Sequence, residues 1–261
     1  MSQAQQLQNP AADLFANQTA LITGAGDGIG KALALRLAEL GAELVLMGRT
    51  QAKLEAVDDA IRAVGGKAAV VCPCDLATLD ETQADSIMEG IQAECGKLDM
   101  LVHNAGILGP RSPIENITLA DWAKVMQVNL TAPYVLTRKA LPLLRNGEQS
   151  RILFTSSGVA RPGRAYWGPY AVSKAGTENL CEILAAELTE THTMRVNSIN
   201  PGPTRTGMRA AAYPAENPNT LPTAEDHIPA YLWLLQRESS AQSGFCYDIW
   251  PLPLNLSRLV P

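Results

Sequence analysis

The chain has 261 residues, of which 46% are hydrophobic and 18% are charged, a balance that can bury a sizeable core and that differs from the composition of disordered chains. Its formal net charge is -5 and its lysines and arginines are scattered, so it lacks the basic stripe that would neutralise a nucleic-acid backbone. Residues 1–17 are polar and no later run is apolar for the length that a bilayer requires, so we expect a cytoplasmic protein that does not enter a membrane.

From residue 19 onward, short β-branched or apolar runs alternate with longer segments of helical period, which is the pattern of βαβ units and a parallel sheet. Two helices begin with capping-box signals, Thr78 with Glu81 and Thr118 with Asp121, and the second is predicted to continue to residue 144. The predicted strands are, in chain order, 19–23, 44–47, 68–72, 98–103, 152–155, 195–199 and 245–249. The expected fold is α/β, a single domain built on a doubly wound parallel sheet of about seven strands with helices on both faces.

Three segments lie outside this alternation. Residues 1–13 form a polar N-terminal extension, the proline-rich excursion 201–222 is a predicted substrate lid, and 251–261 is a C-terminal tail. The five cysteines are dispersed and are expected to be thiols. Cys72 and Cys74 form a C-x-C pair, but no second ligand pair lies at metal-site spacing, so we predict no metal site.

A glycine-rich turn follows the first predicted strand and opens the first predicted helix, with the spacing T-G-x-x-x-G-x-G from Thr23 onward. Glycines let the backbone turn tightly and approach a pyrophosphate, whose charge is met by free N–H groups and by the positive end of the helix dipole. This context predicts a Rossmann-type dinucleotide site. The predicted contacts in the turn are Gly24, Gly26, Asp27, Gly28, Ile29 and Gly30.

The end of the second predicted strand distinguishes two cofactors, because a carboxylate there would bind the ribose hydroxyls of NAD and a basic residue would bind the extra phosphate of NADP. Here the chain has Arg49, which can fork onto a phosphate, and Thr50, which adds a hydroxyl donor. We therefore predict NADP(H) as the preferred cofactor, with NAD(H) as the alternative. Asp27 would repel that phosphate if it faced it, and its expected task is local turn capping.

A second motif joins a tyrosine to a lysine. Tyr170 and Lys174 are four residues apart, which puts both side chains on one helix face. A free tyrosine has a pKa of about 10, so a tyrosine base near neutrality needs a cation such as Lys174 to stabilise its phenolate. Ser157 lies 13 residues before Tyr170, and Ser156 beside it would point to the opposite side of an extended chain, so Ser156 ranks second.

With these motifs the chain resembles the short-chain dehydrogenase/reductase family from about residue 14 to residue 249. Within that family it is most similar to the bacterial YciK-type oxidoreductases, through residues 106–109, 158–170 and 200–206. The resemblance implies an NAD(P)-dependent oxidoreductase that moves a hydride between the nicotinamide and a carbonyl or secondary alcohol.

The resemblance also implies a catalytic set, in which Tyr170 is the general acid/base and Lys174 additionally holds the nicotinamide ribose. Ser157 would polarise the substrate oxygen, and Asn129 would hold a water of the proton relay. Pro133 lacks an N–H, so the carbonyl of Asn129 would be left free to accept from that water.

Matching positions imply further cofactor contacts at the carboxyl ends of later strands. Asp75 would bind the adenine, whereas His103 is expected to be a packed strand-end residue rather than a catalyst. Together with Tyr170 and Lys174, the implied contacts are Asp75, Leu76, Asn104, Ala105, Gly106, Pro201, Gly202, Thr204 and Thr206.

The expected partner is a small-molecule carbonyl or alcohol substrate. An arginine cluster in the wall of the substrate site would suit an anionic compound. The alternative is that most of these arginines are solvated or bind cofactor phosphates. The predicted wall residues are Arg161, Arg164, Tyr166, Trp167, Arg205 and Arg209. Two alternatives to the dehydrogenase remain, an NADP-binding sensor or scaffold with little turnover and a dehydratase or epimerase on the same fold. The resemblance further implies a homodimer or homotetramer that pairs through the helices at 119–144 and 170–189.

Overall fold

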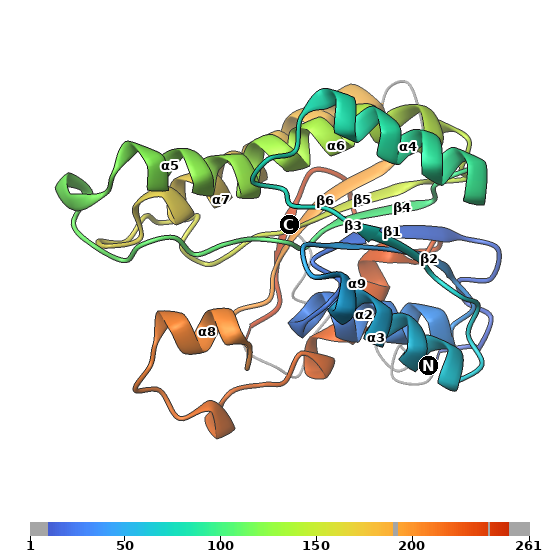
Figure 1. The fold of residues 1–261 in the computed structure, drawn as a ribbon, viewed down its shortest axis with the longest axis horizontal. Helices are drawn as coiled ribbons and strands as arrows, with labels where there is room; N and C mark the ends of the chain where they lie inside the picture. The colour runs from blue at the N-terminus through green and yellow to red at the C-terminus, as the bar shows by residue number, and fades with distance from the viewer. Residues whose placement is uncertain (1–9, 190–192, 240, 251–261) are drawn as a thin grey trace.

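The computed structural model describes residues 10–189, 193–239 and 241–250, and it contains one parallel sheet of order β3-β2-β1-β4-β5-β6-β7 (Figure 1). The strands are β1 (Thr19–Thr23), β2 (Glu43–Gly48), β3 (Val70–Pro73), β4 (Met100–His103), β5 (Arg151–Thr155), β6 (Arg195–Asn200) and β7 (Cys246–Asp248). Each strand end lies within two residues of its predicted position. The predicted fold class is confirmed.

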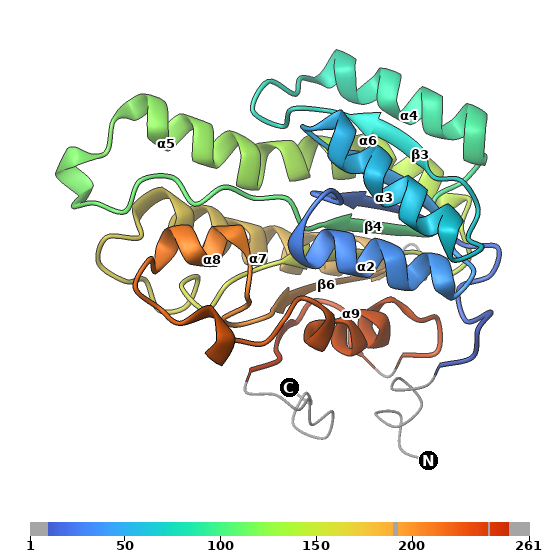
Figure 2. The same cartoon turned by 60° about the horizontal axis from the view of Figure 1, so that its bottom comes forward.

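Helices cover both faces of this sheet. They are α2 (Gly28–Glu39), α3 (Gln51–Ala63), α4 (Glu81–Cys95), α5 (Leu119–Met126), α6 (Ala132–Arg145), α7 (Gly168–Thr189), α8 (Gly207–Ala212) and α9 (Ile228–Leu235). In Figure 1, α4, α6 and α7 lie above the sheet and α2, α3 and α9 lie below it, and Figure 2 shows the lower layer from its own side. Each layer has an apolar core, with Leu33, Leu37 and Tyr231 on one face and Leu136 and Leu184 on the other.

The strand order reverses between β1 and β4, because the chain adds β2 and β3 on one side of β1 and then crosses back to the other side. In open parallel sheets, ligands bind in the crevice that such a reversal leaves at the carboxyl ends of the strands. The glycine-rich turn after β1 and the segment after β4 border that crevice.

The start of α4 differs from the prediction by two residues. Its N-cap is Asp80, whose side chain accepts from the N–H of Gln83 at 2.8 Å while the Gln83 side chain accepts from the N–H of Asp80 at 3.2 Å. Aspartate caps a helix at least as well as threonine, so this capping box prevails over the one predicted at Thr78. The other capping signal is confirmed, since Thr118 Oγ1 accepts from the N–H of Asp121 at 3.0 Å.

The helix predicted to run unbroken from 119 to 144 contains one π-helical turn, η2 (Gln127–Thr131), between α5 and α6. Pro133 has no N–H to give to the carbonyl of Asn129. Thr177 Oγ1 of α7 lies 3.2 Å from that carbonyl and 2.8 Å from the Ser173 carbonyl, so its one proton is shared between the two. The wider turn therefore contacts a second helix, and the pattern of one helix does not contain that contact.

Residues 201–222 leave the sheet after β6 and form α8 and the short 3₁₀ turn η3 (Pro218–Thr220). Ala212 of α8 packs in a small apolar cluster with Trp167 and Tyr170. Residues 1–9 of the predicted extension and the whole predicted tail, 251–261, lie outside the described residues. Along the described part of the chain, no helix has the length and apolar character needed to span a membrane.

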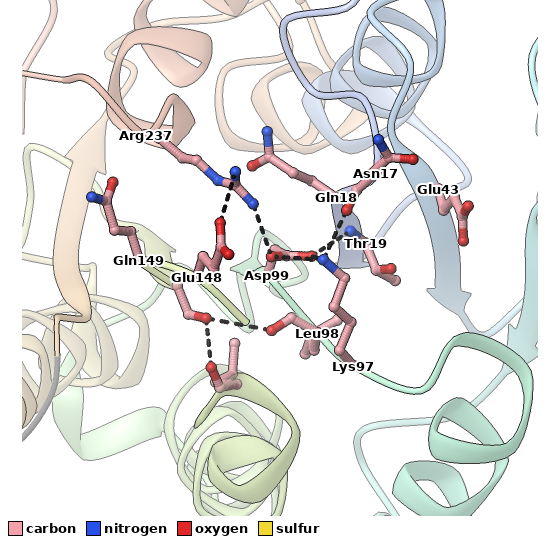
Figure 3. Close-up of polar contacts among 12 residues, drawn as sticks. Asn17, Gln18, Thr19, Glu43, Lys97, Leu98, Asp99, Glu148, Gln149 and Arg237 are labelled. Carbon is pink, nitrogen blue, oxygen red and sulfur yellow. Dashed lines mark hydrogen bonds and ion pairs between the residues drawn. The ribbon is translucent and has the colours of Figure 1, made fainter. Parts of the chain in front are cut away.

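At the amino-terminal edge of the strands, the fully buried carboxylate of Asp99 forms a hydrogen bond and ion pairs (Figure 3). Asp99 Oδ2 accepts from the backbone N–H of Thr19 at 2.9 Å and pairs with Lys97 Nζ at 3.0 Å. Arg237 Nη2 lies 3.7 Å from Asp99 Oδ1, and Arg237 Nη1 lies 3.3 Å from the exposed Glu148. This network joins the first residues of β1 and β4 to the chain after α9.

Candidate active site

A cavity of about 500 Å³ lies at the carboxyl ends of the strands. It extends from the glycine-rich turn and the end of β2 to α7 and α8. Every predicted cofactor contact except Gly30 lines it, and so do Ser157, Tyr170 and Lys174 of the predicted catalytic set. Asn129 is not among the lining residues.

The glycine-rich turn packs closely against the end of β4. Gly24 has a φ of +70° and Gly28 a φ of +50°, which favour glycine. A Cβ on Gly30 would meet the Gly24 carbonyl oxygen and would lie 2.6 Å from the Asn104 side-chain nitrogen. Thr23 Oγ1 accepts from the N–H of Asn104 at 3.0 Å. Gly30 therefore serves the packing of the turn, which explains why it does not reach the cavity.

Asp27 is the N-cap of α2, as predicted, because its side chain accepts from the N–H of Gly28 at 2.8 Å. Its other oxygen lies 2.6 Å from Lys53 Nζ. The hydrogen bond from Lys53 is the main cause that lowers the pKa of Asp27, with the Gly28 bond adding to it against a smaller effect of burial. Lys53 thus offsets the negative charge that Asp27 brings to the phosphate loop.

The residues at this end of the cavity fit a dinucleotide with an additional phosphate. The turn offers a cradle that side chains would fill, directly before the N-terminus of α2. Arg49 and Thr50 are exposed and line the cavity. Within the described ranges, the Arg49 guanidinium makes no ion pair, so it is available to a phosphate.

The other end of the cavity brings together the predicted tyrosine, serine and lysine. Burial raises the pKa of Tyr170, and a hydrogen bond with Ser157 opposes that rise. Lys174 Nζ donates to the Thr155 carbonyl at 2.7 Å and lies 5.8 Å from the centre of the Tyr170 ring. Burial lowers the pKa of Lys174 to about 8, although the charge of Glu178 acts in the opposite direction. The Tyr170 phenol, the Ser157 hydroxyl and the Lys174 ammonium group therefore lie together at one end of the cavity.

Asn129 is buried behind this point, in η2. Its side chain accepts from the N–H of Ile107 at 2.8 Å and donates to the Ile107 carbonyl at 2.9 Å and to Ser173 Oγ at 3.0 Å. A Cβ on Gly106 would lie 3.4 Å from the Asn129 side-chain oxygen and 3.6 Å from Lys174 Nζ. Gly106 is thus the small residue that lies next to both Asn129 and Lys174.

Two neighbouring side chains bond to groups outside the predicted catalytic set. His103 Nε2 lies 2.8 Å from Thr137 Oγ1, and the ring stacks on Phe154. Burial, together with the charge of Lys174, lowers the pKa of His103 to about 3, so this residue is the packed strand-end histidine that was expected. Ser156 lines the cavity, and its Oγ donates to Glu178, whereas Ser157 bonds to Tyr170.

The predicted arginine cluster does not assemble around the cavity. Trp167 and Arg209 line it, but Arg209 forms two contacts of 2.6 Å with Glu216. Arg161 pairs with Glu178, and Arg205 donates to the Leu221 carbonyl. The remaining predicted wall residues, which are exposed and outside the cavity lining, are Arg164 and Tyr166.

Two charged residues, Lys53 in the cavity lining and Arg111 behind it, were not predicted from the sequence. Lys53 follows Thr50 by three residues on α3, and that helical spacing is a signal that could have identified it. Arg111 has no such signal. Its guanidinium lies 4.5 Å from the centre of the Trp167 ring and 4.9 Å from that of Tyr213, and it donates to the Ala212 carbonyl. It joins the loop after β4 to α8 and to the segment before α7.

Comparison with known proteins agrees with this geometry. Residues 18–217 match the family described as short chain dehydrogenase. The chain is 40% identical over 242 residues to the uncharacterized oxidoreductase YciK of Escherichia coli K12, which covers 93% of this chain and 95% of that protein. A short chain dehydrogenase structure from Pseudomonas syringae superposes with a TM-score of 0.89 at 45% identity, over 91% of this chain and 96% of that one. Another, from E. coli CFT073 and complexed with NADPH, has a TM-score of 0.89 at 40% identity, over 93% of this chain and all 100% of that one. The chain therefore belongs to the short-chain dehydrogenase family and is an NAD(P)-dependent oxidoreductase.

Proposed function

We propose that this protein is an NADP(H)-preferring oxidoreductase that moves a hydride between the nicotinamide and a carbonyl or secondary alcohol carbon, with Tyr170 as general acid/base. The observation that carries the proposal is one cavity with Arg49 and Thr50 at one end and Ser157, Tyr170 and Lys174 at the other. The similar E. coli protein crystallised with NADPH supports the choice of cofactor.

Different residues of the chain would bind different parts of the cofactor. The glycine-rich turn and the N-terminus of α2 would receive the pyrophosphate, and Arg49 with Thr50 would receive the additional phosphate. Asp75 follows β3 and lines the cavity, in a position to meet the adenine. When bound, the nicotinamide supplies or accepts the hydride.

The proton follows a route through the phenol. In the reducing direction, Tyr170 gives its proton to the substrate oxygen that Ser157 polarises, and the Lys174 ammonium stabilises the phenolate that remains. The Asn129 carbonyl accepts from Thr177, but a carbonyl oxygen has two lone pairs, so its second one can accept from a relay water. Oxidation reverses these steps.

The test is a panel of carbonyl compounds with NADPH, followed by absorbance of the reduced nicotinamide. Tyr170→Phe should lower turnover by about 100-fold or more while the Kd for NADPH stays within about twofold, because only the proton donor is removed. A sensor or scaffold would bind NADPH without consuming it, and a dehydratase or epimerase would form product without net cofactor change. Substantial turnover by Tyr170→Phe would remove this residue from the mechanism.

We also propose a cytoplasmic homodimer or homotetramer that pairs through α6 and α7. Tyr134 on α6 is 46% exposed, and Val172 and Ile183 on α7 are 45% and 47% exposed, which supports an interface on these helices. Light scattering on the purified protein measures the molar mass, and a monomer at micromolar concentration contradicts the pairing.

A further inference from the structure

A buried carboxylate lies behind the proposed catalytic residues, and the chemistry described so far does not use it. Glu178 follows Lys174 by four residues on α7 and is 6% exposed. Its Oε1 accepts from Ser156 Oγ at 2.5 Å and from the Cys246 thiol at 3.2 Å, and its Oε2 lies 2.6 Å from Arg161 Nε. Burying a carboxylate is costly unless it is paired and hydrogen-bonded, and Glu178 meets both conditions.

The partners of Glu178 come from three separate parts of the chain. Ser156 follows β5, Arg161 lies in the loop before α7, and Cys246 belongs to β7. Ser156 directly precedes Ser157, whose side chain bonds to Tyr170 on the other side of the turn. The backbone N–H of Ser156 also donates to the Ile199 carbonyl at 2.7 Å. Glu178 and the Ile199 carbonyl therefore both bond to the residue that directly precedes Ser157.

Glu178 also acts on Lys174 by its charge. Burial is the main cause that lowers the pKa of Lys174, and the negative charge of Glu178 raises it. Other charged and hydrogen-bonding groups surround the carboxylate on every element packed against it. The groups that interact with Glu178 are Arg161 from the loop, Ser156 after β5, Cys246 on β7, and Lys174 and Cys181 on α7, while Ser198 on β6 lies next to the two cysteines and Asp248 on β7 acts on Arg161.

We propose that Glu178 is a positioning residue of this site, whose carboxylate, balanced by Arg161, orients the Ser156–Ser157 turn and keeps a negative charge one helical turn from Lys174. The inference rests on the proposed function, because it places Glu178 behind the proton transfer of Tyr170. Glu178 itself touches neither cofactor nor substrate, since it does not line the cavity.

The charges of Glu178 and Arg161 determine the direction in which each substitution should shift the pKa values of Lys174 and Tyr170. Removing a negative charge disfavours the Lys174 cation and favours the Tyr170 phenolate, so it lowers the pKa of both groups. Removing a positive charge raises the pKa of both. The direction is thus the same whichever of the two groups sets the pH at which reduction slows. A residue that only filled space would leave that pH unchanged.

The experiment measures kcat against pH for reduction of a carbonyl compound that the wild-type protein accepts, with the Kd for NADPH and the Tm of each variant. We call the part of this profile where kcat decreases with rising pH the falling limb. Glu178→Gln, which keeps the side-chain shape, should move the falling limb to a pH lower by about 0.5 to 1 unit. Arg161→Gln should move it up by less, because the Arg161 side chain is 60% exposed and solvent screens it. The double variant should lie between the two.

Arg62→Gln is the matched control, since it removes an exposed arginine from an ion pair with the buried Asp58 on α3 and should leave the falling limb in place. Opposite pH shifts of the falling limb in Glu178→Gln and Arg161→Gln support the inference. A falling limb that stays fixed in Glu178→Gln, or that moves in the same direction in both of these variants, overturns it. If Glu178→Gln does not fold, Arg161→Gln decides alone, because its limb must move upward. A wild-type protein without any carbonyl turnover refutes the proposed function instead.

Discussion

Two cations that follow β2, Arg49 and Lys53, differ in whether they form an ion pair. Lys53 is 2.6 Å from Asp27 and so offsets the carboxylate of the phosphate loop, whereas Arg49 makes no ion pair among the described residues. Both side chains of the Lys53–Asp27 pair are more than half exposed, so salt screens their attraction. Discrimination between NADP and NAD at this end of the cavity is therefore expected to depend mainly on Arg49.

Arg49→Ala should raise the KM for NADP by about tenfold or more, because a guanidinium–phosphate contact is a strong charge-assisted hydrogen bond. The KM for NAD should change little, since NAD lacks that phosphate. Steady-state kinetics with both cofactors measure the ratio. Arg62→Ala serves as the control, because Arg62 lies at the other end of α3 and pairs with Asp58. A cofactor ratio unchanged by Arg49→Ala would assign the preference to other residues.

Lys174 predicts how the reaction responds to pH. Its pKa of about 8 means that the side chain is a cation below that pH and loses its charge above it. Reduction by the wild-type protein should therefore be fastest below about pH 8 and should slow as the pH rises through that value. Initial rates with saturating NADPH between pH 6 and 10 measure this profile. A rate of reduction that increases across that range contradicts the assignment of the cation to Lys174.

Among the elements, the side chain of Arg111 joins α8 to the loop after β4. Arg111 lies against the rings of Trp167 and Tyr213, and it bonds to the last residue of α8. Trp167 and Ala212 also line the cavity. The wall of the substrate end therefore depends on a contact between segments that are far apart in the sequence.

Arg111→Met keeps the aliphatic chain but removes the guanidinium. It should raise the KM for the carbonyl substrate by about tenfold, because the aromatic contacts and the bond to α8 are lost together. The Kd for NADPH should stay within about twofold, since Arg111 does not line the cavity. Fluorescence titration and steady-state kinetics give the two values. Equal losses in both would mean that the substitution disturbs the fold rather than the wall.

The elements also show what the sequence could predict. Strands such as β1 and β2 were predictable because a buried parallel strand is a short apolar run that turn residues end. The N-cap of α4 was not, because Asp80 and Thr78 both offer a cap and only the local backbone decides between them. The π-helical turn contacts Thr177 on another helix, and Glu178 and Arg111 make their contacts with segments that are distant in the sequence, so none of these could be predicted from local patterns. Motif spacing predicted Tyr170 and Lys174 together because four residues separate them on one helix, whereas Ser157 was predicted from its match to the family.

For the whole molecule, the Asp99 network (Figure 3) lies where β1 and β4 begin, whereas the cavity lies where the strands end. Asp99 is fully buried, while its partners Lys97 and Arg237 are about one-third exposed. A buried carboxylate that loses its charge no longer attracts these cations, which keep Glu148 and the Asn17 carbonyl as partners, and its bond to the backbone of β1 is weakened. The amino-terminal edge of the sheet therefore affects stability without touching the proposed chemistry.

Asp99→Asn should lower the free energy of unfolding by about 2 to 4 kcal/mol. For a chain of this size the Tm should fall by roughly 5 to 15 °C. The kcat/KM at room temperature should be unchanged, because Asp99 is remote from the cavity. Glu148→Gln is the control, and it should cost less than about 1 kcal/mol because the Glu148 side chain is 83% exposed. Thermal unfolding with parallel assays tests the pair, and an Asp99→Asn protein as stable as the wild type contradicts the account.

The distance between these two ends of the sheet matters for anyone who wishes to engineer the protein. Substitutions at remote sites with no shared partners usually contribute additively. Tolerance to heat can therefore be improved around Asp99 in one round of directed evolution, and the wall around Trp167 can be rebuilt for new compounds in another, with each library screened independently.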